Sequence, residues 1–390
     1  MKNLETLIQE LCPDGVEFVK LGECCTFKRG TTITAKNAIA GDVPVLAGGQ
    51  KPAYYHNVSN RTGETIVVAG SGAYAGYVSY WTIPVFLSDS FSVQPDNRLV
   101  TKFVYYFLKN IQQKIFATKK GSGVPHVHGS SIAKFEIPLP PIEVQTEIVR
   151  ILDKFTSLEA ELEAELDCRK RQYEYYRDKL LSFDNVGGQE IEWKKMSEVF
   201  DMRNGYTPSK AKAEYWEGGT IPWFRMEDIR ENGRILSDSI QHITMEGVKN
   251  GKLFPANSFI LATTATIGEH ALVIADSLAN QQFTNLTVRK SLSDRLLIKF
   301  VFHYMFIVDE WCKKNINVSG FASVDMNKFK KLEFPIPSLD EQNRIVNILD
   351  RFESLTTSLQ SGLPAEIAAR RQQYEYYRDK LLTFKRKGAA

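Results

Sequence analysis

Few residues in this sequence have the types and spacing that catalysis requires. His126 and His128 could place two imidazoles on one metal ion, but no third ligand follows nearby, so we expect no metal site. Asp184, Glu192 and Lys194 have the residue types of a nuclease site, at a spacing that arises often by chance. The sequence contains no G-x-x-x-x-G-K-S/T or G-x-G-x-x-G loop and no Asn/Asp-Pro-Pro-aromatic tetrapeptide. We therefore predict that the chain itself performs no catalysis and holds no cofactor.

Residues suited to contact with phosphates occur twice, at matching places. Two lysine pairs, 119–120 and 313–314, end helices predicted at 101–117 and 293–313, and each pair precedes a loop that contains glycine. Lysine beside exposed backbone N–H groups is suited to nucleic-acid phosphate. The alternative is a solvated helix C-terminus, where lysine complements the helix dipole. The candidate DNA contacts in these loops are Lys119, Lys120, Ser122, His126, His128, Lys313, Lys314 and Ser319.

A second pair of loops follows the first predicted strand of each half of the chain, at 28–32 and 203–210. Arginine and asparagine can form bidentate hydrogen bonds with guanine and adenine edges in the major groove. A tight turn at Gly30 and Gly205 explains the same residues equally well. Arg225 adjoins Trp216, Trp223 and Phe224, which we expect in a domain core. The candidate contacts here are Lys28, Arg29, Thr31, Arg203, Asn204, Tyr206, Thr207, Lys210 and Arg225.

The chain is a tandem duplication. The segment QYEYYRDKLL at 172–181 recurs without change at 373–382, an offset of 201. Upstream the offset is 197, where IVRILDKF at 148–155 matches IVNILDRF at 345–352 and Gln145 matches Gln342. Each half therefore has a divergent globular part and a nearly identical tail. In the globular parts we expect mixed α/β structure, with strands at Thr65–Ala69, Ile83–Leu87, Ser258–Ala262 and Ala271–Ile274.

The two tails are predicted to be long helices. Apolar residues recur every three or four positions from 148 to 183, which indicates one amphipathic face. Such a helix is roughly 55 Å long, so it exceeds the diameter of a domain of this size. We expect the two helices to pair as an antiparallel coiled coil, and the alternative is that each packs on its own domain. The second tail has four extra residues, and Pro364 there predicts a kink or a restart, with Pro364 in the first turn of the new segment.

Composition excludes several classes of protein. The chain has 390 residues, of which 43% are hydrophobic and 24% charged, as in ordinary globular proteins of two or three domains. No run approaches the ~18 apolar residues of a membrane span, and the acid at position 5 disfavours a signal peptide. Five cysteines without a C-x-x-C motif favour a reducing cytoplasm. The net charge of +3 averages segments of +4 (1–142), −4 (143–184), +1 (185–339) and +2 (340–390).

The sequence resembles the DNA-specificity (S) subunit of type I restriction–modification systems over essentially the whole chain. Four features carry the resemblance: the pattern from Gly205-Tyr206-Thr207-Pro208 through Tyr215-Trp216 to Ile221-Pro222-Trp223 and Asp228; the Gly-Ser-Gly-Val-Pro loop at 121–125; the repeated Ile-Pro-x-Pro, Gln, Ile-Val-x-Ile-Leu-Asp run; and the duplicated QYEYYRDKLL.

The resemblance implies an α+β fold with a pseudo-two-fold internal repeat. Two mixed α/β target-recognition domains, 1–142 and 185–339, would be joined by spacer helices 143–184 and 340–390, the second with its kink or restart near 362–364. Each domain would recognise one half of a split site in double-stranded DNA. The alternatives are a stand-alone pseudo-dimeric DNA-binding regulator and a coiled-coil scaffold that binds no DNA.

The resemblance also implies partners. Two methyltransferase (M) subunits and motor-nuclease (R) subunits would carry S-adenosylmethionine, ATP and Mg²⁺, and would methylate adenine N6. No membrane contact is expected. The expected partner-binding residues lie in the repeated segment: Tyr173, Tyr176, Arg177, Tyr374, Tyr377 and Arg378.

Overall fold

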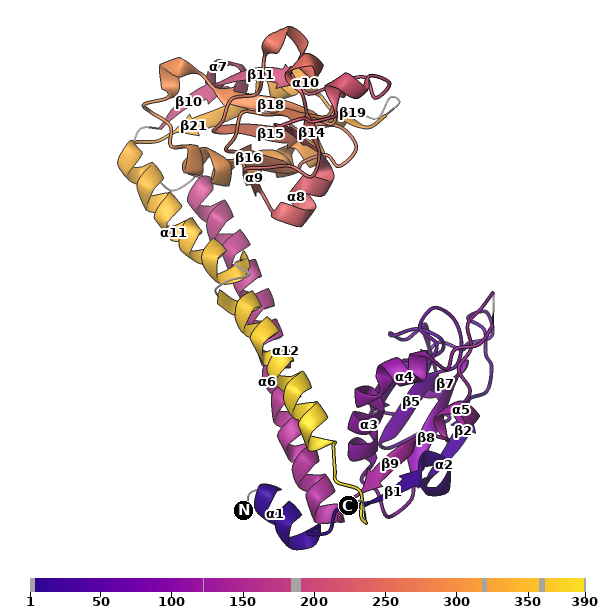
Figure 1. Cartoon of the computed structure of the whole chain (residues 1–390). Helices are drawn as coiled ribbons and strands as arrows, with labels where there is room; N and C mark the ends of the chain where they lie inside the picture. The colour runs from indigo at the N-terminus through magenta and orange to yellow at the C-terminus, as the bar shows by residue number, and fades with distance from the viewer. Residues whose placement is uncertain (1–3, 122, 184–190, 318–320, 358–361, 389–390) are drawn as a thin grey trace. The chain divides into compact units, whose positions relative to one another are not determined.

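The computed structural model describes residues 4–121, 123–183, 191–317, 321–357 and 362–388. The chain forms two compact units (Figure 1): unit 1 contains residues 1–164 and 365–390, and unit 2 contains residues 165–364. Each unit combines one globular part with portions of the long helical segments. The expected α+β architecture with an internal repeat is confirmed. Within the described ranges, no helix has both the length and the apolar sequence that a membrane crossing needs.

Unit 1 is built on a four-stranded sheet of order β2-β8-β5-β6 and a three-stranded sheet of order β4-β3-β7. Strand β5 (Thr65–Ala69) is buried along its length because successive side chains enter different cores. Ile66 and Val68 join the main core, whereas Val67 packs with Leu46 and Leu87 of the smaller sheet. The other elements are α1 (Leu4–Leu11), β1 (Glu17–Lys20), α2 (Leu21–Cys24), β2 (Cys25–Arg29), β3 (Val43–Leu46), β4 (Tyr54–His56), β6 (Val78–Trp81), β7 (Phe86–Leu87), β8 (Ser90–Pro95), α3 (Thr101–Asn110), α4 (Gln112–Phe116), α5 (Gly129–Ile132), β9 (Glu136–Leu139) and α6 (Ile142–Leu181), which continues into unit 2.

Unit 2 repeats this plan with a five-stranded sheet of order β11-β18-β15-β16-β13 and a three-stranded sheet of order β14-β12-β17. Its elements are β10 (Glu192–Lys195), α7 (Met196–Val199), β11 (Phe200–Asn204), β12 (Ile221–Phe224), α8 (Met226–Asn232), β13 (Ile235–Leu236), β14 (His242–Ile243), β15 (Ser258–Ala262), β16 (His270–Val273), β17 (Leu278–Ala279), β18 (Phe283–Val288), α9 (Ile298–Lys314), β19 (Ile316–Asn317), β20 (Ser323–Val324), α10 (Met326–Phe329), β21 (Glu333–Ile336), α11 (Leu339–Thr357) and α12 (Gly362–Leu381), with short 3₁₀ turns between some of them.

Strand register shows which residues of the two units are equivalent. Arg29 pairs with Phe91, and Phe91 pairs with Val68 across the next ladder. In unit 2, Asn204 pairs with Thr284, and Thr284 pairs with Leu261. Arg29 and Asn204 therefore occupy the same place in the two sheets, although these strands share little sequence. We call residues related in this way counterparts.

The repeated glutamine determines where one helix of each unit begins. Gln145 is fully buried, accepts a hydrogen bond from the Val100 N–H (2.8 Å) and donates to the carbonyls of Arg98 and Pro140. Gln342 forms the same bonds with the Leu297 N–H and two carbonyls. The helix predicted from residue 293 therefore begins at Ile298, directly after the capped Leu297.

Other boundaries differ modestly from expectation. Strands β5 and β15 have the predicted bounds, and β16 lies one residue earlier than predicted. The strand predicted at 83–87 is reduced to Phe86–Leu87, because Pro84 has no N–H to donate to a ladder. The helix predicted at 101–117 is divided at Ile111 into α3 and α4.

The long helices pair in antiparallel order within each unit. In unit 1, α12 packs on the first half of α6: Phe155 stacks on Tyr377 at a centroid distance of 5.5 Å, and Arg371 pairs with Glu159 and Glu163. In unit 2, α11 packs on the second half of α6, where Tyr176 stacks on Phe352 at 5.8 Å. The predicted restart is confirmed, because α11 ends at Thr357 and α12 begins at Gly362, two residues before Pro364.

The end of the chain returns to its beginning in unit 1. The Val16 N–H donates to the Lys385 carbonyl (2.8 Å), and the Lys387 N–H donates to the Val16 carbonyl (2.9 Å). Arg386 pairs with Glu136 of β9 at 2.6 Å. The tail thus extends the β1–β9 region by backbone pairing.

Candidate functional site

The glycine turns predicted at the ends of β2 and β11 are present in both units. The Gly30 N–H donates to the Ser90 carbonyl (2.9 Å), and the Gly205 N–H donates to the Phe283 carbonyl (2.8 Å). A Cβ on Gly30 would lie 2.2 Å from the Leu87 carbonyl oxygen, and one on Gly205 would lie 2.2 Å from that of Asn280. Only glycine fits such close backbone contact. The turn interpretation is therefore confirmed, and it places the preceding Arg29 and Asn204 at a sheet edge.

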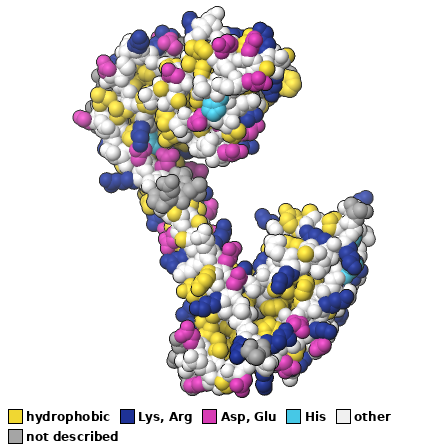
Figure 2. Space-filling view, viewed as in Figure 1, with side chains coloured by type: hydrophobic (Ala, Val, Ile, Leu, Met, Phe, Trp, Pro, Cys, Tyr) yellow, Lys and Arg dark blue, Asp and Glu magenta, His cyan; other side chains and the backbone are white. Residues whose placement is uncertain are grey.

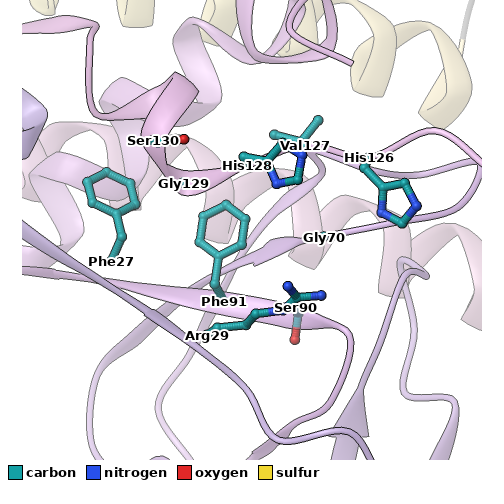
Figure 3. A pocket seen from close by; sticks show the side chains of 10 residues that line it. All are labelled: Phe27, Arg29, Gly70, Ser90, Phe91, His126, Val127, His128, Gly129 and Ser130. Carbon is teal, nitrogen blue, oxygen red and sulfur yellow. The ribbon is translucent and has the colours of Figure 1, made fainter. Parts of the chain in front are cut away.

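Three predicted contacts of unit 1 meet at one pocket. Arg29, His126 and His128 line a cavity of about 290 Å³ whose walls include the rings of Phe27 and Phe91 (Figure 3). The two imidazoles lie nearly parallel with centroids 6.4 Å apart. The Arg29 guanidinium is exposed and lies 3.7 Å from the Asp89 carboxylate. This arrangement can donate hydrogen bonds to an anion or to the edge of a base beside an apolar floor.

The lysines around this pocket differ in their surroundings. Lys28 and Lys120 are exposed, as is Thr31, whose N–H donates to the Leu87 carbonyl. Lys119 instead lies over the Phe116 ring (4.5 Å) and donates to the Ala73 carbonyl (3.2 Å). Lys119 is therefore partly engaged within the unit. Ser122 lies outside the described residues. The visible face of the globular part of unit 1 carries many Lys and Arg side chains (Figure 2).

The counterpart region of unit 2 has the Asn204 amide at the place of Arg29, with two threonine hydroxyls beside it. The Thr284 hydroxyl donates to Asn204 Oδ1 (3.0 Å) and lies 3.1 Å from the Thr263 hydroxyl. Arg203 lies over the Phe254 ring at 4.6 Å, and burial lowers its pKa. Asn204 is exposed, and its side-chain carbonyl oxygen is held by Thr284. The two units thus present different chemistry on one scaffold.

The remaining predicted contacts of unit 2 lie mostly in structural interactions. The Tyr206 hydroxyl accepts the Lys249 N–H (2.6 Å), and Thr207 donates to Gln281 (2.6 Å). Arg225 lies over Trp223, which is buried with Phe224 in a core, as expected for these aromatics. Lys210 and Lys314 are exposed, and Lys313 pairs with Glu310 in the last turn of α9. Ser319 lies outside the described residues.

Asp89, Thr263 and Thr284 also belong to these regions but were not predicted. Asp89 pairs with Arg29, and Thr284 bonds to Asn204 although the two lie 80 residues apart in sequence. Thr263 reaches this group through its contact with Thr284. The divergent globular sequences give no local pattern that would have identified them.

The repeated segment exposes two tyrosines in each copy: the predicted Tyr176 and Tyr377, which are 39% and 36% exposed, and their neighbours Tyr175 and Tyr376. Tyr173 and Tyr374 pack against the main cores of their units, and Tyr176 and Tyr377 stack on the neighbouring helix. The side chains of Arg177 and Arg378 are only 11% and 18% exposed, and each lies over the ring of Tyr173 or Tyr374. In contrast, Tyr175 and Tyr376 are each 61% exposed. Tyr175 and Tyr376 are therefore the most exposed tyrosines of the two copies, with Tyr176 and Tyr377 next to them.

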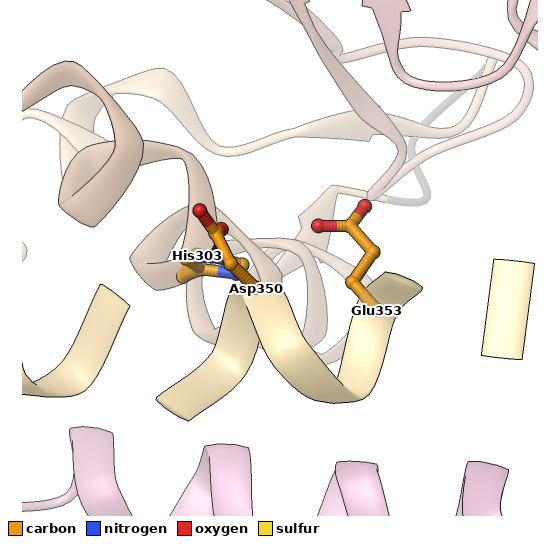
Figure 4. Close-up of side chains that lie close together, drawn as sticks. All are labelled: His303, Asp350 and Glu353. Carbon is orange, nitrogen blue, oxygen red and sulfur yellow. Dashed lines mark hydrogen bonds and ion pairs between the residues drawn. The ribbon is translucent and has the colours of Figure 1, made fainter. Parts of the chain in front are cut away.

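One cluster among the described residues has metal-ligand types. His303 of α9 lies beside Asp350 and Glu353 of α11, and His303 Nε2 is 2.9 Å from Asp350 Oδ1 (Figure 4). The Lys299 ammonium, however, also pairs with Asp350, so the carboxylate that a metal ion would bind already has a cationic partner. In unit 1 the counterparts are Lys102, Tyr106 and Asp153, with Tyr106 donating to Asp153 (2.5 Å). We call these two groups the helix–domain joints, because each connects a globular helix to a long one.

The nuclease-like residues Asp184, Glu192 and Lys194 do not form a catalytic group among the described residues. Glu192 forms ion pairs with Lys194 (2.7 Å) and Arg295 on the surface of strand β10, and Asp184 lies outside the described residues. These carboxylate contacts are satisfied by neighbouring cations. No arrangement of a nuclease site is formed by the described members of this group.

Known proteins resemble this chain along its length. The family model of the type I restriction modification DNA specificity domain matches residues 13–167 and 189–369. The EcoR124I/EcoR124II specificity subunit of Escherichia coli is 34% identical over 413 aligned residues, covering 98% of this chain and 97% of that protein. The EcoprrI specificity subunit of Escherichia coli is 54% identical, but that match spans 54% of this chain and 53% of the relative.

Solved structures share the fold. The S subunit of a type I restriction-modification system from M. genitalium has a TM-score of 0.54 at 17% identity and covers 94% of this chain and 96% of its own. A chain from a structure on complex assembly and conformational transition of the type I R-M system has a TM-score of 0.62 at 18% identity, covering 95% and 98%. With two matches of the family model and a full-length relative at 34% identity, the chain belongs to the type I restriction modification DNA specificity family.

Proposed function

We propose that the chain is the DNA-specificity subunit of a type I restriction–modification complex, in which unit 1 recognises one half of a split DNA site and unit 2 the other. The observation that carries this is the pair of counterpart sheet edges. Arg29 with His126 and His128 in unit 1, and Asn204 with Thr263 and Thr284 in unit 2, place different donors and acceptors on equivalent backbones. Arginine is suited to guanine and asparagine to adenine.

The partners are two methyltransferase subunits. Identical segments in the two units expose Tyr175 and Tyr376 to the same extent, so the chain offers two equal docking surfaces. Exposed tyrosine is enriched in protein interfaces because it combines a large apolar ring with a hydroxyl. S-adenosylmethionine, ATP and Mg²⁺ belong to the methyltransferase and motor-nuclease partners, and the chain itself is non-catalytic. It acts in the cytoplasm, where the DNA is.

The test is expression of the chain with its methyltransferase partner in a host that lacks both, followed by single-molecule sequencing of the genome. We expect N6-methyladenine in one split motif with two defined halves and a constant gap. The control is the same host with the methyltransferase alone. If both proteins are present and no methylation occurs, but the chain alone binds a split site tightly, the chain is a stand-alone regulator instead. No selective DNA binding in either assay would support a scaffold.

A further inference from the structure

We propose that each unit carries a wedge at the tip of one hairpin, and that this wedge inserts an apolar side chain between stacked base pairs: Phe321 in unit 2 and Val124 in unit 1. The inference rests on the proposed function, because it assigns to the DNA-recognition units a second task, deformation of the duplex.

The two side chains are exposed at one position of the duplication. Phe321 is 99% exposed and Val124 is 58% exposed. Both follow a Ser-Gly pair, and they are separated by 197 residues, the offset of the repeat upstream of its identical segment. A single exposed apolar residue needs no explanation. An apolar residue exposed at the same hairpin position in both copies indicates a shared task.

The stems of both hairpins are fixed to the central sheets. In unit 2, β19 pairs with β20, and the Val324 N–H donates to the Thr263 carbonyl (2.9 Å), while Val324 itself is buried in the core. In unit 1, Lys120 and His126 exchange two backbone hydrogen bonds (2.9 and 2.8 Å). The Val127 N–H donates to the Gly70 carbonyl (2.9 Å), the counterpart of the Thr263 contact.

Each stem also adjoins the residues that we assign to base recognition. Thr263 receives the hairpin stem of unit 2 and contacts Thr284, which in turn holds Asn204. In unit 1, His126 closes the hairpin and lines the same pocket as Arg29 (Figure 3). We therefore expect a duplex whose base edges reach Asn204 or Arg29 to pass beside the adjacent hairpin.

Insertion of an apolar side chain is a known means of unstacking a base step and bending the duplex. The Phe321 ring can stack on the exposed base and so replace part of the lost base stacking, whereas Val124 can only fill space. We therefore expect stronger deformation in the half-site of unit 2. Such local unstacking lowers the cost of extracting an adenine, which a partner methyltransferase requires.

The test uses the chain in complex with its methyltransferase subunits and a duplex that contains the methylated motif. 2-Aminopurine replaces one base at a time, and its fluorescence rises where stacking is lost. The variants are Phe321→Ala, Phe321→Leu and Val124→Ala. Ile240→Ala is the matched control, because Ile240 is an exposed apolar residue of unit 2 outside the hairpin.

For the unaltered chain we expect a several-fold fluorescence increase at one step of the half-site recognised by unit 2. Phe321→Ala should abolish this increase and weaken binding to the motif roughly tenfold. Phe321→Leu should retain part of both, because leucine fills space without stacking, and Ile240→Ala should retain both in full. A duplex with an abasic site at that step should restore binding of the Phe321→Ala complex, because the step is already unstacked. Phe321→Ala with unchanged fluorescence and affinity overturns the wedge and leaves the proposed function intact. Failure of the unaltered complex to bind its motif overturns the proposed function instead.

Discussion

Arg29 and Asn204 are the side chains whose replacement should separate the two half-sites. Arg29→Ala removes the exposed guanidinium of the unit 1 pocket, and Asn204→Ala removes the amide held by Thr284 in unit 2. A bidentate base contact contributes about 1–3 kcal/mol of discrimination. We expect each variant to relax one position in one half of the methylated motif, and a different half for each variant. Methylation sequencing of the two variants checks this, and relaxation of the same half by both would contradict the assignment.

His303 should make the stability of unit 2 depend on pH near neutrality. Burial lowers the pKa of His303 below its ordinary 6.5, although the bond to Asp350 opposes this. Folding therefore favours the neutral imidazole. The contribution of His303 to the free energy of unfolding is complete above about pH 6.5, and it is lost as the pH falls through the lowered pKa. The pKa of Asp350 is also lowered: burial raises it, but the bonds and charges of Lys299 and His303 outweigh burial. The contribution of Asp350 to stability is therefore lost only below pH 3.8, outside the range of this comparison.

The matched variant is His303→Tyr, which installs the residue that Tyr106 supplies at the joint of unit 1. Lys299, Asp350, Glu353 and His270 face position 303 in both proteins, so the two proteins differ only in the side chain at 303. We expect the midpoint of thermal unfolding to fall more between pH 7.5 and 5.5 in the unaltered chain than in His303→Tyr. Equal losses in the two proteins would show that His303 does not titrate in this range.

At the scale of elements, Tyr175 and Tyr376 predict the stoichiometry of the complex. Tyr175→Ala should leave one methyltransferase subunit bound, Tyr376→Ala should leave the other, and the double variant should bind none. Each exposed ring is removed without disturbing a core. Native mass spectrometry measures the outcome, with Tyr55→Ala as the control for an exposed tyrosine outside the repeat. Retention of both subunits by the double variant would exclude this surface.

The elements show how far sequence reasoning extends. Helix α6 and the restart before Pro364 were predicted because an apolar period and a proline are local features. That Tyr175 and Tyr376 are more exposed than the predicted Tyr176 and Tyr377 could not be read from the repeat, because the exposure depends on the helix packed against it. Thr263 and Thr284 could not be associated with Asn204, since only sheet register joins them. The exposure of Phe321 likewise depends on a hairpin whose two strands have only two residues each.

At the scale of the whole molecule, the continuity of α6 from unit 1 into unit 2 predicts that its length sets the unread gap of the DNA site. Deletion of one helical turn within 159–167, with a matching turn removed from the start of α12, should shorten the gap and leave both half-sites unchanged. The paired deletion is needed because Arg371 bridges Glu159 and Glu163. Methylation sequencing checks this, and altered half-sites with a constant gap would contradict it.

The return of the chain end to Val16 has a consequence for biogenesis. Unit 2 is one continuous stretch, whereas the core of unit 1 is completed by Leu382 and Tyr374 from the last part of the chain. At 5–20 residues per second, the ribosome needs roughly 11–45 s to add the residues from 165 to 390. Throughout that time the first half of the nascent chain exposes apolar surface that only the final helix covers. Premature termination late in the message would thus yield a chain whose first unit, not its last, is the one left unfinished.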